Sequence, residues 1–274
     1  MTWKQRLGGV LGSAVFGAGL HRRLLRGTAA VAVFHRIDDR YPDNPITLTS
    51  KRFRAFCRFF AERFEVVPFG TLVGLLERHV PLRGQLAITF DDGYRDNYRI
   101  AAPILAELGL PACFFLTSGF IESTEIPWWD REAGISSEWM SWDEVRALHG
   151  MGFEIGAHTV THADLGVLQG EAARGEIVDS RTELEGRIGA EVPYFAYPFG
   201  RESQMTEANR ELVRLAGYRC CPSAFGGVVR TGDDPFRFRR IPVTGWYRSP
   251  AHLGAEILRS GLRPGPAAPS AHPA

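Results

Sequence analysis

Cysteine is scarce in this 274-residue chain, and the few cysteines present do not have a metal-binding spacing. Cys57, Cys113, Cys220 and Cys221 include no CxxC pair, so neither a zinc knuckle nor a redox motif can be assigned to them. Buried free thiols are therefore expected, which weakly favours a reducing compartment.

An excess of charge of either sign is also absent. The chain carries 32 Lys plus Arg against 31 Asp plus Glu. A strongly basic balance would indicate a nucleic-acid partner, so we expect none, and the global charge does not indicate a strongly acidic ligand either. Any ligand must therefore be recognised by local groups.

The sequence has no apolar run long enough to be an evident membrane span. Residues 7–20 are apolar but fall short of the ~20 residues that a spanning helix needs. A basic cluster at 21–23 follows them directly, which disfavours translocation, and no signal-peptide cleavage site precedes it. We expect residues 1–27 to form an interfacial or packed helix, with a disordered leader as the open alternative. The expected location is cytoplasmic or peripheral at the inner face of the membrane.

What the sequence does have is an alternation of short β-rich runs and longer helical segments, which predicts parallel β/α units. About seven such units without a clear linker favour a single α/β domain, an irregular barrel over residues 28–262. A Pro/Ala/Ser-rich tail at 263–274 is predicted to be disordered. The predicted strands are 29–35, 86–91, 112–117, 153–157, 194–197, 218–223 and 238–243. The predicted helices are 97–108, 141–149, 171–188 and 206–216, with a capping box at Ser141 and Glu144 and a C-terminal stop at Gly217.

Polar residues directly follow several of these strands. In a β/α barrel, catalytic groups lie where strands end and loops begin. Such residues are His35, the pair Asp91 and Asp92, His158, and the run 198–200.

The run HTVTH places two histidines, His158 and His162, at one of these strand ends. An extended chain would separate them by ~13 Å, but coiling into one helical turn would make them neighbours. Two imidazoles and a carboxylate make a three-ligand site with open positions, as in a catalytic metal centre. An HxxxH pair alone is weak evidence, and exposed or core-satisfied histidines remain an even alternative.

The run DDG supplies the missing carboxylate. Gly93 lets the chain turn sharply, so that Asp91 and Asp92 can face one cavity, where one holds a metal and the other takes a proton. An Asx turn leading into a helix is the competing interpretation. The attachment of the pair to a buried strand favours the functional one.

The runs TFDDG and HTVTH, together with SWDEV, GFEIGAH and YFAYPFG, resemble the polysaccharide deacetylase family, also called the NodB homology or carbohydrate esterase family 4 group. The resemblance spans about residues 29–243 and implies a distorted (β/α)7-8 barrel. It also implies a divalent metal held by Asp92, His158 and His162, with Asp91 as general base.

The sequence departs from the family pattern in two places. The usual late catalytic histidine has no good counterpart, since only His252 and His272 follow the last predicted strand. His35 instead resembles the acid of the branch that includes exopolysaccharide and poly-N-acetylglucosamine deacetylases, and we assign it as the acid, with a structural histidine as the alternative. Ala196 stands where many members carry an Arg that orients the base. Arg239 or Arg240 is then the expected partner of Asp91, with a surface salt bridge as the alternative.

The resemblance also assigns a role to Phe199, whose backbone N–H matches the position that stabilises the oxyanion. Trp128, Trp129 and Asp130 form a candidate lip for sugar stacking, although packing against the barrel is at least as compatible with adjacent tryptophans. Tyr197 is a further candidate substrate-binding residue.

From this resemblance we expect the protein to be an N-deacetylase that removes acetyl or another acyl group from the amino sugars of a polysaccharide or lipid-linked glycan. Zn²⁺ is the expected cofactor, with Co²⁺ or Ni²⁺ as alternatives. A glycan-binding protein without activity is the main competing hypothesis. A glycosidase is disfavoured, because adjacent aspartates are poorly placed to flank a bond at ~5–9.5 Å. The oligomeric state and a peripheral association of the N-terminus with a membrane stay open.

Overall fold

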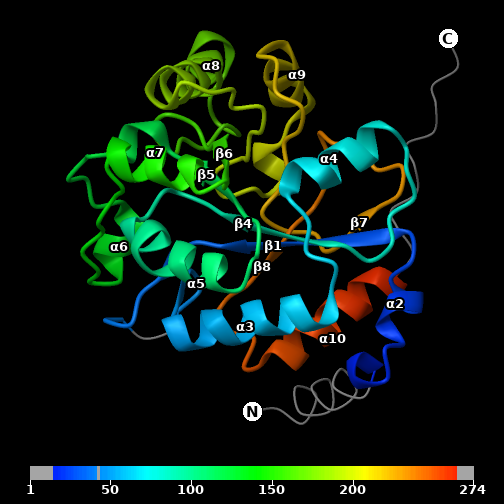
Figure 1. Cartoon of the computed structure of the whole chain (residues 1–274). Coiled ribbons are helices and arrows are strands. Elements are labelled where there is room, and N and C mark those ends of the chain that lie inside the picture. Colours follow the sequence, from blue (N-terminus) through cyan, green and yellow to red (C-terminus); the bar gives the residue numbers. More distant parts are fainter. Residues whose placement is uncertain (1–14, 42–43, 264–274) are drawn as a thin grey trace, which may run out of the picture.

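The core of the fold is a parallel sheet whose strands are buried on both faces. The computed structural model describes residues 15–41 and 44–263. Strands β1 (Thr28–Phe34), β4 (Leu86–Phe90), β5 (Cys113–Leu116) and β6 (Glu154–Ala157) pair in the order β6-β5-β4-β1 (Figure 1). Every residue of β1 is buried, as expected for a strand covered by helices on both sides.

The sheet curls into a distorted barrel. β8 (Ile241–Pro242) pairs in parallel with β1, and β7 (Val229–Arg230) pairs antiparallel with the start of β1. Beyond β6 the ring continues through isolated bridges and single hydrogen bonds: Ala157 with Phe195, Tyr194 with Cys220, and Ser223 N–H to the Phe238 carbonyl. The predicted α/β barrel is thereby confirmed.

The prediction is wrong for two of the strands, which do not form regular strands in the structure. Residues 194–197 and 218–223 contribute only bridges, and the predicted strand 238–243 is reduced to β8. Pro193 and Pro198 flank the first of these runs, and Pro222 lies within the second. Because proline has no N–H to donate to a ladder, the chain there follows the barrel without forming continuous pairs.

All of the predicted helices are present, with small shifts at their ends. Residues 97–108 begin as a π-helix, η1 (Asn97–Ala101), that continues into α5 (Ala102–Glu107). Pro103 lacks the N–H for a regular i→i−4 bond, which accounts for the irregular start. The other predicted helices are α7 (Trp142–Gly150), α8 (Gly170–Ile188) and α9 (Glu207–Leu215). The capping box at Ser141 and Glu144 is present, and Gly217 has a left-handed φ of 80°.

Several elements are absent from the sequence-based prediction. The unpredicted elements are β2 (Arg36–Ile37), β3 (Thr47–Leu48), β7, α3 (Ser50–Arg63), α4 (Phe69–Glu77), α6 (Trp128–Glu132), α10 (Pro250–Leu262) and the 3₁₀ turns Ser118–Phe120 and Glu202–Gln204.

The helices group on different sides of the barrel. α3 and α10 lie beside each other on one side, and α7, α8 and α9 gather on another (Figure 1).

About half of the predicted N-terminal helix at 1–27 lies outside the described residues, as does all but Arg263 of the predicted tail at 263–274. Within the described part, α2 (His21–Leu24) packs beside α3. Phe16 is buried, and the His21 ring bonds through Nε2 to the Arg63 carbonyl at 2.6 Å. None of the helices in the described ranges has the length and apolar character needed to cross a membrane.

The parallel register brings the predicted site residues to one edge of the sheet. Phe34 pairs with Phe90, and Leu116 pairs with Ala157. His35, Asp91 and His158 each follow directly after one of these paired residues. The barrel therefore presents them at the carboxyl ends of its strands, where catalytic groups of this architecture lie.

Candidate metal centre and active site

Asp92, His158 and His162 converge at this edge, as the sequence predicts. Asp92 Oδ1 lies 3.5 Å from His158 Nε2 and 3.3 Å from His162 Nε2. One ligand atom from each residue lies within 4.8 Å of the others. Asp92 and His158 are buried, so the three groups form a site shielded from bulk water.

The loop that joins the two histidines is a bend rather than the helical turn expected from the sequence. Thr159 and His162 both adopt left-handed backbone conformations, with φ of 67° and 58°. Two such residues reverse the chain within a few positions, and the two imidazole rings lie 5.1 Å apart. Asp92, with φ of 78°, and Gly93, with φ of 97°, make a comparable turn after β4.

The polar atoms of this cluster fit a divalent metal ion. His158 Nδ1 lies 2.8 Å from the Ala196 carbonyl oxygen. A carbonyl can only accept, so Nδ1 carries the proton and the Nε2 lone pair faces Asp92, the usual arrangement of a metal-ligating histidine. Asp92 Oδ1 is buried without a hydrogen-bond partner among the described residues. Such an orphaned carboxylate oxygen costs free energy unless a cation compensates it.

The second carboxylate of the pair, Asp91, forms a buried two-point ion pair with Arg240. Arg240 Nη1 and Nη2 each donate to one Asp91 carboxylate oxygen at 2.7 Å, and both side chains are almost fully buried. Burial raises the pKa of Asp91, but Arg240 and the nearby histidines more than offset this and hold the pKa below its ordinary value. Of the two predicted arginines, Arg240 is therefore the one that faces Asp91, while Arg239 packs beside Gly226.

His35 lies next to this pair. It follows β1, and its neighbour Phe34 accepts a hydrogen bond from the Asp91 N–H at 3.0 Å. Asn97 Nδ2 donates to the His35 carbonyl at 2.7 Å. Burial lowers the pKa of His35, and Asp92 and Asp91 oppose that effect only in part. The neutral imidazole therefore predominates at neutral pH in the metal-free protein.

Two of the other predicted residues border the histidines. The Phe199 ring lies 4.8 Å from the His162 ring, and its backbone has a left-handed φ of 60°. The Trp129 ring lies 4.7 Å from the same imidazole. Trp128 packs edge-on against Trp129 and is 57% exposed, which leaves its ring accessible.

The remaining candidates lie elsewhere. Tyr197 is fully buried against Phe195 and presents no surface to a substrate. His252, which lies on α10, packs against Trp246. His272 lies outside the described residues.

Asp130 does not belong to an exposed lip. It is buried in an ion pair with Arg36 and accepts hydrogen bonds from the Tyr94 and Ser137 hydroxyls. The Tyr94 hydroxyl in turn accepts from Trp129 Nε1 at 2.9 Å. The network fixes the Trp129 ring beside His162. It was missed because its members are remote in sequence, and the only signal was an unusual Asp after two tryptophans.

Comparison with known proteins agrees with this geometry. A family model described as polysaccharide deacetylase matches residues 80–221, which include both the TFDDG and the HTVTH runs. The chain belongs to the polysaccharide deacetylase family. This match confirms the resemblance that the TFDDG and HTVTH runs indicate.

Three relatives of this chain are distant in sequence, with identities of 25% or less. The protein YxkH of Bacillus subtilis (strain 168), named as a polysaccharide deacetylase, is 25% identical over 216 residues, covering 78% of this chain and 71% of YxkH. The Streptococcus pyogenes deacetylase PplD, solved in complex with acetate, superposes with a TM-score of 0.70 at 19% identity, covering 84% of this chain and 98% of PplD. IcaB from Ammonifex degensii gives 0.69 at 21% identity, covering 86% and 98%. These two structures share the fold of this chain.

Proposed function

We propose that this protein is a metal-dependent hydrolase that removes an N-acyl group, acetyl by preference, from an amino sugar of a glycan. The observation that carries the proposal is that two adjacent aspartates have different partners. Asp92 faces two histidine Nε2 atoms, and Asp91 is held apart by Arg240. A ligand carboxylate beside a separately held, ionised carboxylate is the arrangement that metal-assisted amide hydrolysis needs.

Asp92, His158 and His162 would hold the ion. Two nitrogen ligands and one oxygen ligand with open positions suit Zn²⁺, with Co²⁺ or Ni²⁺ as alternatives. When bound, such an ion acts as a Lewis acid that lowers the pKa of water and stabilises negative charge on a carbonyl oxygen.

Asp91 is the proposed general base. Arg240 keeps its carboxylate ionised at neutral pH and fixes the carboxylate plane through two parallel hydrogen bonds. Asp91 then takes a proton from the attacking water as the new C–O bond forms at the amide carbon. The Phe199 N–H is proposed to donate to the oxyanion that develops there.

His35 is the proposed acid for the departing nitrogen. The C–N bond breaks with transfer of a proton to that nitrogen, leaving a carboxylate and a free amine. Because burial lowers the pKa of His35, proton donation is favoured toward the acidic side of neutrality. The ring of Trp128, exposed beside Trp129, is the proposed contact for a sugar face.

The test combines metal analysis with product detection. The purified protein is loaded with Zn²⁺, Co²⁺ or Ni²⁺ and incubated with a panel of N-acetylated oligosaccharides, and both acetate and free amine are measured. The proposal expects one bound ion per chain and equal amounts of the two products. Metal binding without release of either product across the panel would instead favour a glycan-binding protein, and absence of metal binding would refute both the ion site and the chemistry.

A further inference from the structure

We propose that Glu176 on α8 is a positioning residue for the metal ligands, because it fixes the bend that carries His158 and His162. The inference rests on the proposed metal site and names a group outside the family-like motifs. The hydrogen bonds of Glu176 go to Val160 and Thr161, which lie between the two histidines. Glu176 acts through the backbone between them.

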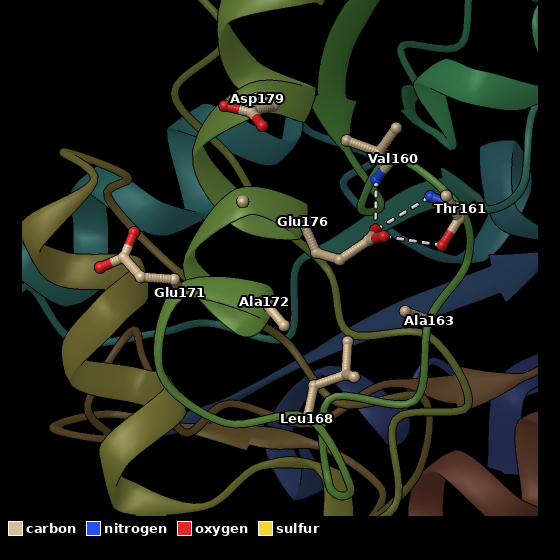
Figure 2. Close-up of a pocket in the computed structure, with 9 residues that line it drawn as sticks. Val160, Thr161, Ala163, Leu168, Glu171, Ala172, Glu176 and Asp179 are labelled. Atoms are coloured by element: carbon tan, nitrogen blue, oxygen red, sulfur yellow. Dashed lines mark hydrogen bonds between the residues drawn. The ribbon is translucent and has the colours of Figure 1, made fainter.

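The carboxylate of Glu176 binds the middle of the HTVTH run at three points (Figure 2). Its Oε2 accepts from the Val160 N–H at 2.8 Å and from the Thr161 N–H at 2.9 Å, and its Oε1 accepts from the Thr161 hydroxyl at 2.7 Å. Bonds to an ionised acceptor are about twice as strong as neutral ones. Three of them on two consecutive residues fix the local backbone.

This bend needs such support. Thr159 and His162 flank the contacted residues, and both have left-handed φ values. A β-branched residue such as Thr rarely adopts this conformation, because its side chain crowds the backbone. Without external hydrogen bonds the run would relax toward ordinary backbone conformations, and the two imidazoles would separate.

The opposite side of the bend is held by the segment after β5. The Ser118 N–H donates to the Thr159 carbonyl at 3.1 Å, and the Gly119 N–H donates to the Val160 carbonyl at 2.8 Å. A Cβ at Gly119 would lie 2.6 Å from the Val160 oxygen, so only glycine allows this approach. The bend is thus clamped between the 118–119 backbone and the Glu176 carboxylate.

The other acids of the same face provide a matched control. Glu171 and Asp179 line the same surface pocket on α8, but their carboxylates lie away from the bend in Figure 2. Glu171 is highly exposed and lies 3.7 Å from Arg174. Removing its side chain deletes an acidic group of the same pocket and helix without removing a contact to Val160 or Thr161.

The experiment compares Glu176→Ala with Glu171→Ala in the full chain. Alanine removes the carboxylate, whereas glutamine would keep an oxygen that can accept the two N–H groups. Zn²⁺ affinity is measured by competition with a chromophoric chelator, and amide hydrogen exchange at Val160 and Thr161 is measured in the metal-free protein. We expect Glu176→Ala to bind Zn²⁺ about 10- to 100-fold more weakly, the usual effect of losing a partner that orients metal ligands. Exchange at the two amides should accelerate, whereas Glu171→Ala should match the wild type in both measurements.

A milder variant keeps the test decisive if Glu176→Ala folds poorly. Thr161→Val preserves the side-chain shape and removes only one of the three hydrogen bonds. We expect it to weaken Zn²⁺ binding by less than Glu176→Ala, with the two N–H groups still protected.

The possible results separate the clamp from the function. If the wild type binds Zn²⁺ and the affinity of Glu176→Ala equals that of Glu171→Ala, the positioning role is refuted, because any loss then reflects charge alone. If the wild type binds no Zn²⁺, the proposed hydrolase fails. In that case exchange at Val160 and Thr161 still decides whether Glu176 holds the bend.

Discussion

Replacing Arg240 by Met should leave the Asp91 carboxylate buried without its partner. In the wild type, Arg240 satisfies Asp91 with two hydrogen bonds of 2.7 Å and donates from Nε to the Ser223 carbonyl at 2.6 Å. Removing one partner of a buried ion pair typically costs about 3–5 kcal/mol. The two side chains are 0% and 2% exposed, so water cannot replace the lost contacts, and we expect an effect in this range.

The pH dependence of this loss has a definite sign. Wild-type Asp91 has a lowered pKa, so its pairing stabilises the fold above the pKa of the unfolded chain, and that stability is lost as the pH falls through the folded pKa. Without Arg240, burial raises the pKa of Asp91 instead. Arg240→Met should therefore lose stability as the pH rises from about 4 through this raised pKa.

Urea unfolding of metal-free protein at pH 5 and pH 8 measures both effects. Arg239→Met is the matched control, since Arg239 is adjacent in sequence and half-buried. The double variant Arg240→Met/Asp91→Asn removes both charges and should recover a large part of the lost free energy of unfolding. If the single variant unfolds like the Arg239→Met control at both pH values and the double variant shows no recovery, the assignment of a buried, mutually dependent pair is wrong.

Three further outcomes are expected. Asp91→Asn should retain metal by elemental analysis but lower kcat by about 10²–10⁴-fold, the range for loss of a general base. His158→Ala should lose both metal and activity. Retained turnover in Asp91→Asn would contradict the base assignment. His35→Asn should keep the metal and lower kcat with little change in KM, so an unchanged kcat would remove His35 from the mechanism. Burial raises the pKa of Asp96 to about 7, so its ionisation should destabilise the wild type by at most about 4 kcal/mol as the pH rises from 4 to 8. In Asp96→Asn the side chain still accepts the Ile37 N–H, and urea unfolding at pH 5 and pH 8 should show no such loss of stability. An unchanged pH trend in the variant would show that Asp96 does not cause the loss of stability at higher pH.

The residues of the candidate metal centre could be predicted because they follow buried strands closely and lie near one another in sequence within each pair. Asp91 and Asp92 come after an apolar run, and His158 and His162 lie close enough in sequence to share one bend. The parallel β/α alternation then implies that these strand ends meet at one edge. Arg240 could be narrowed to a pair of adjacent arginines, but only the three-dimensional register distinguishes it from Arg239.

Other parts of the site carry no local signal. Glu176 occupies an ordinary helical position, and only the return of α8 past the bend brings it to Val160 and Thr161. The Arg36–Asp130 ion pair joins residues 94 positions apart. The prolines after β6 were visible in the sequence, but their effect on the barrel depends on which N–H groups the neighbouring strands require.

The contact between His158 and Ala196 has a consequence for how this barrel tolerates substitution. The acceptor is a main-chain oxygen, so no replacement of the side chain at position 196 can delete it directly. That position is fully enclosed, so a larger side chain there would have to displace its neighbours, and a charged one would have to find a partner inside the barrel. The orientation of the His158 imidazole therefore depends on the main chain at Ala196, whereas the orientation of the Asp91 carboxylate depends on the Arg240 side chain.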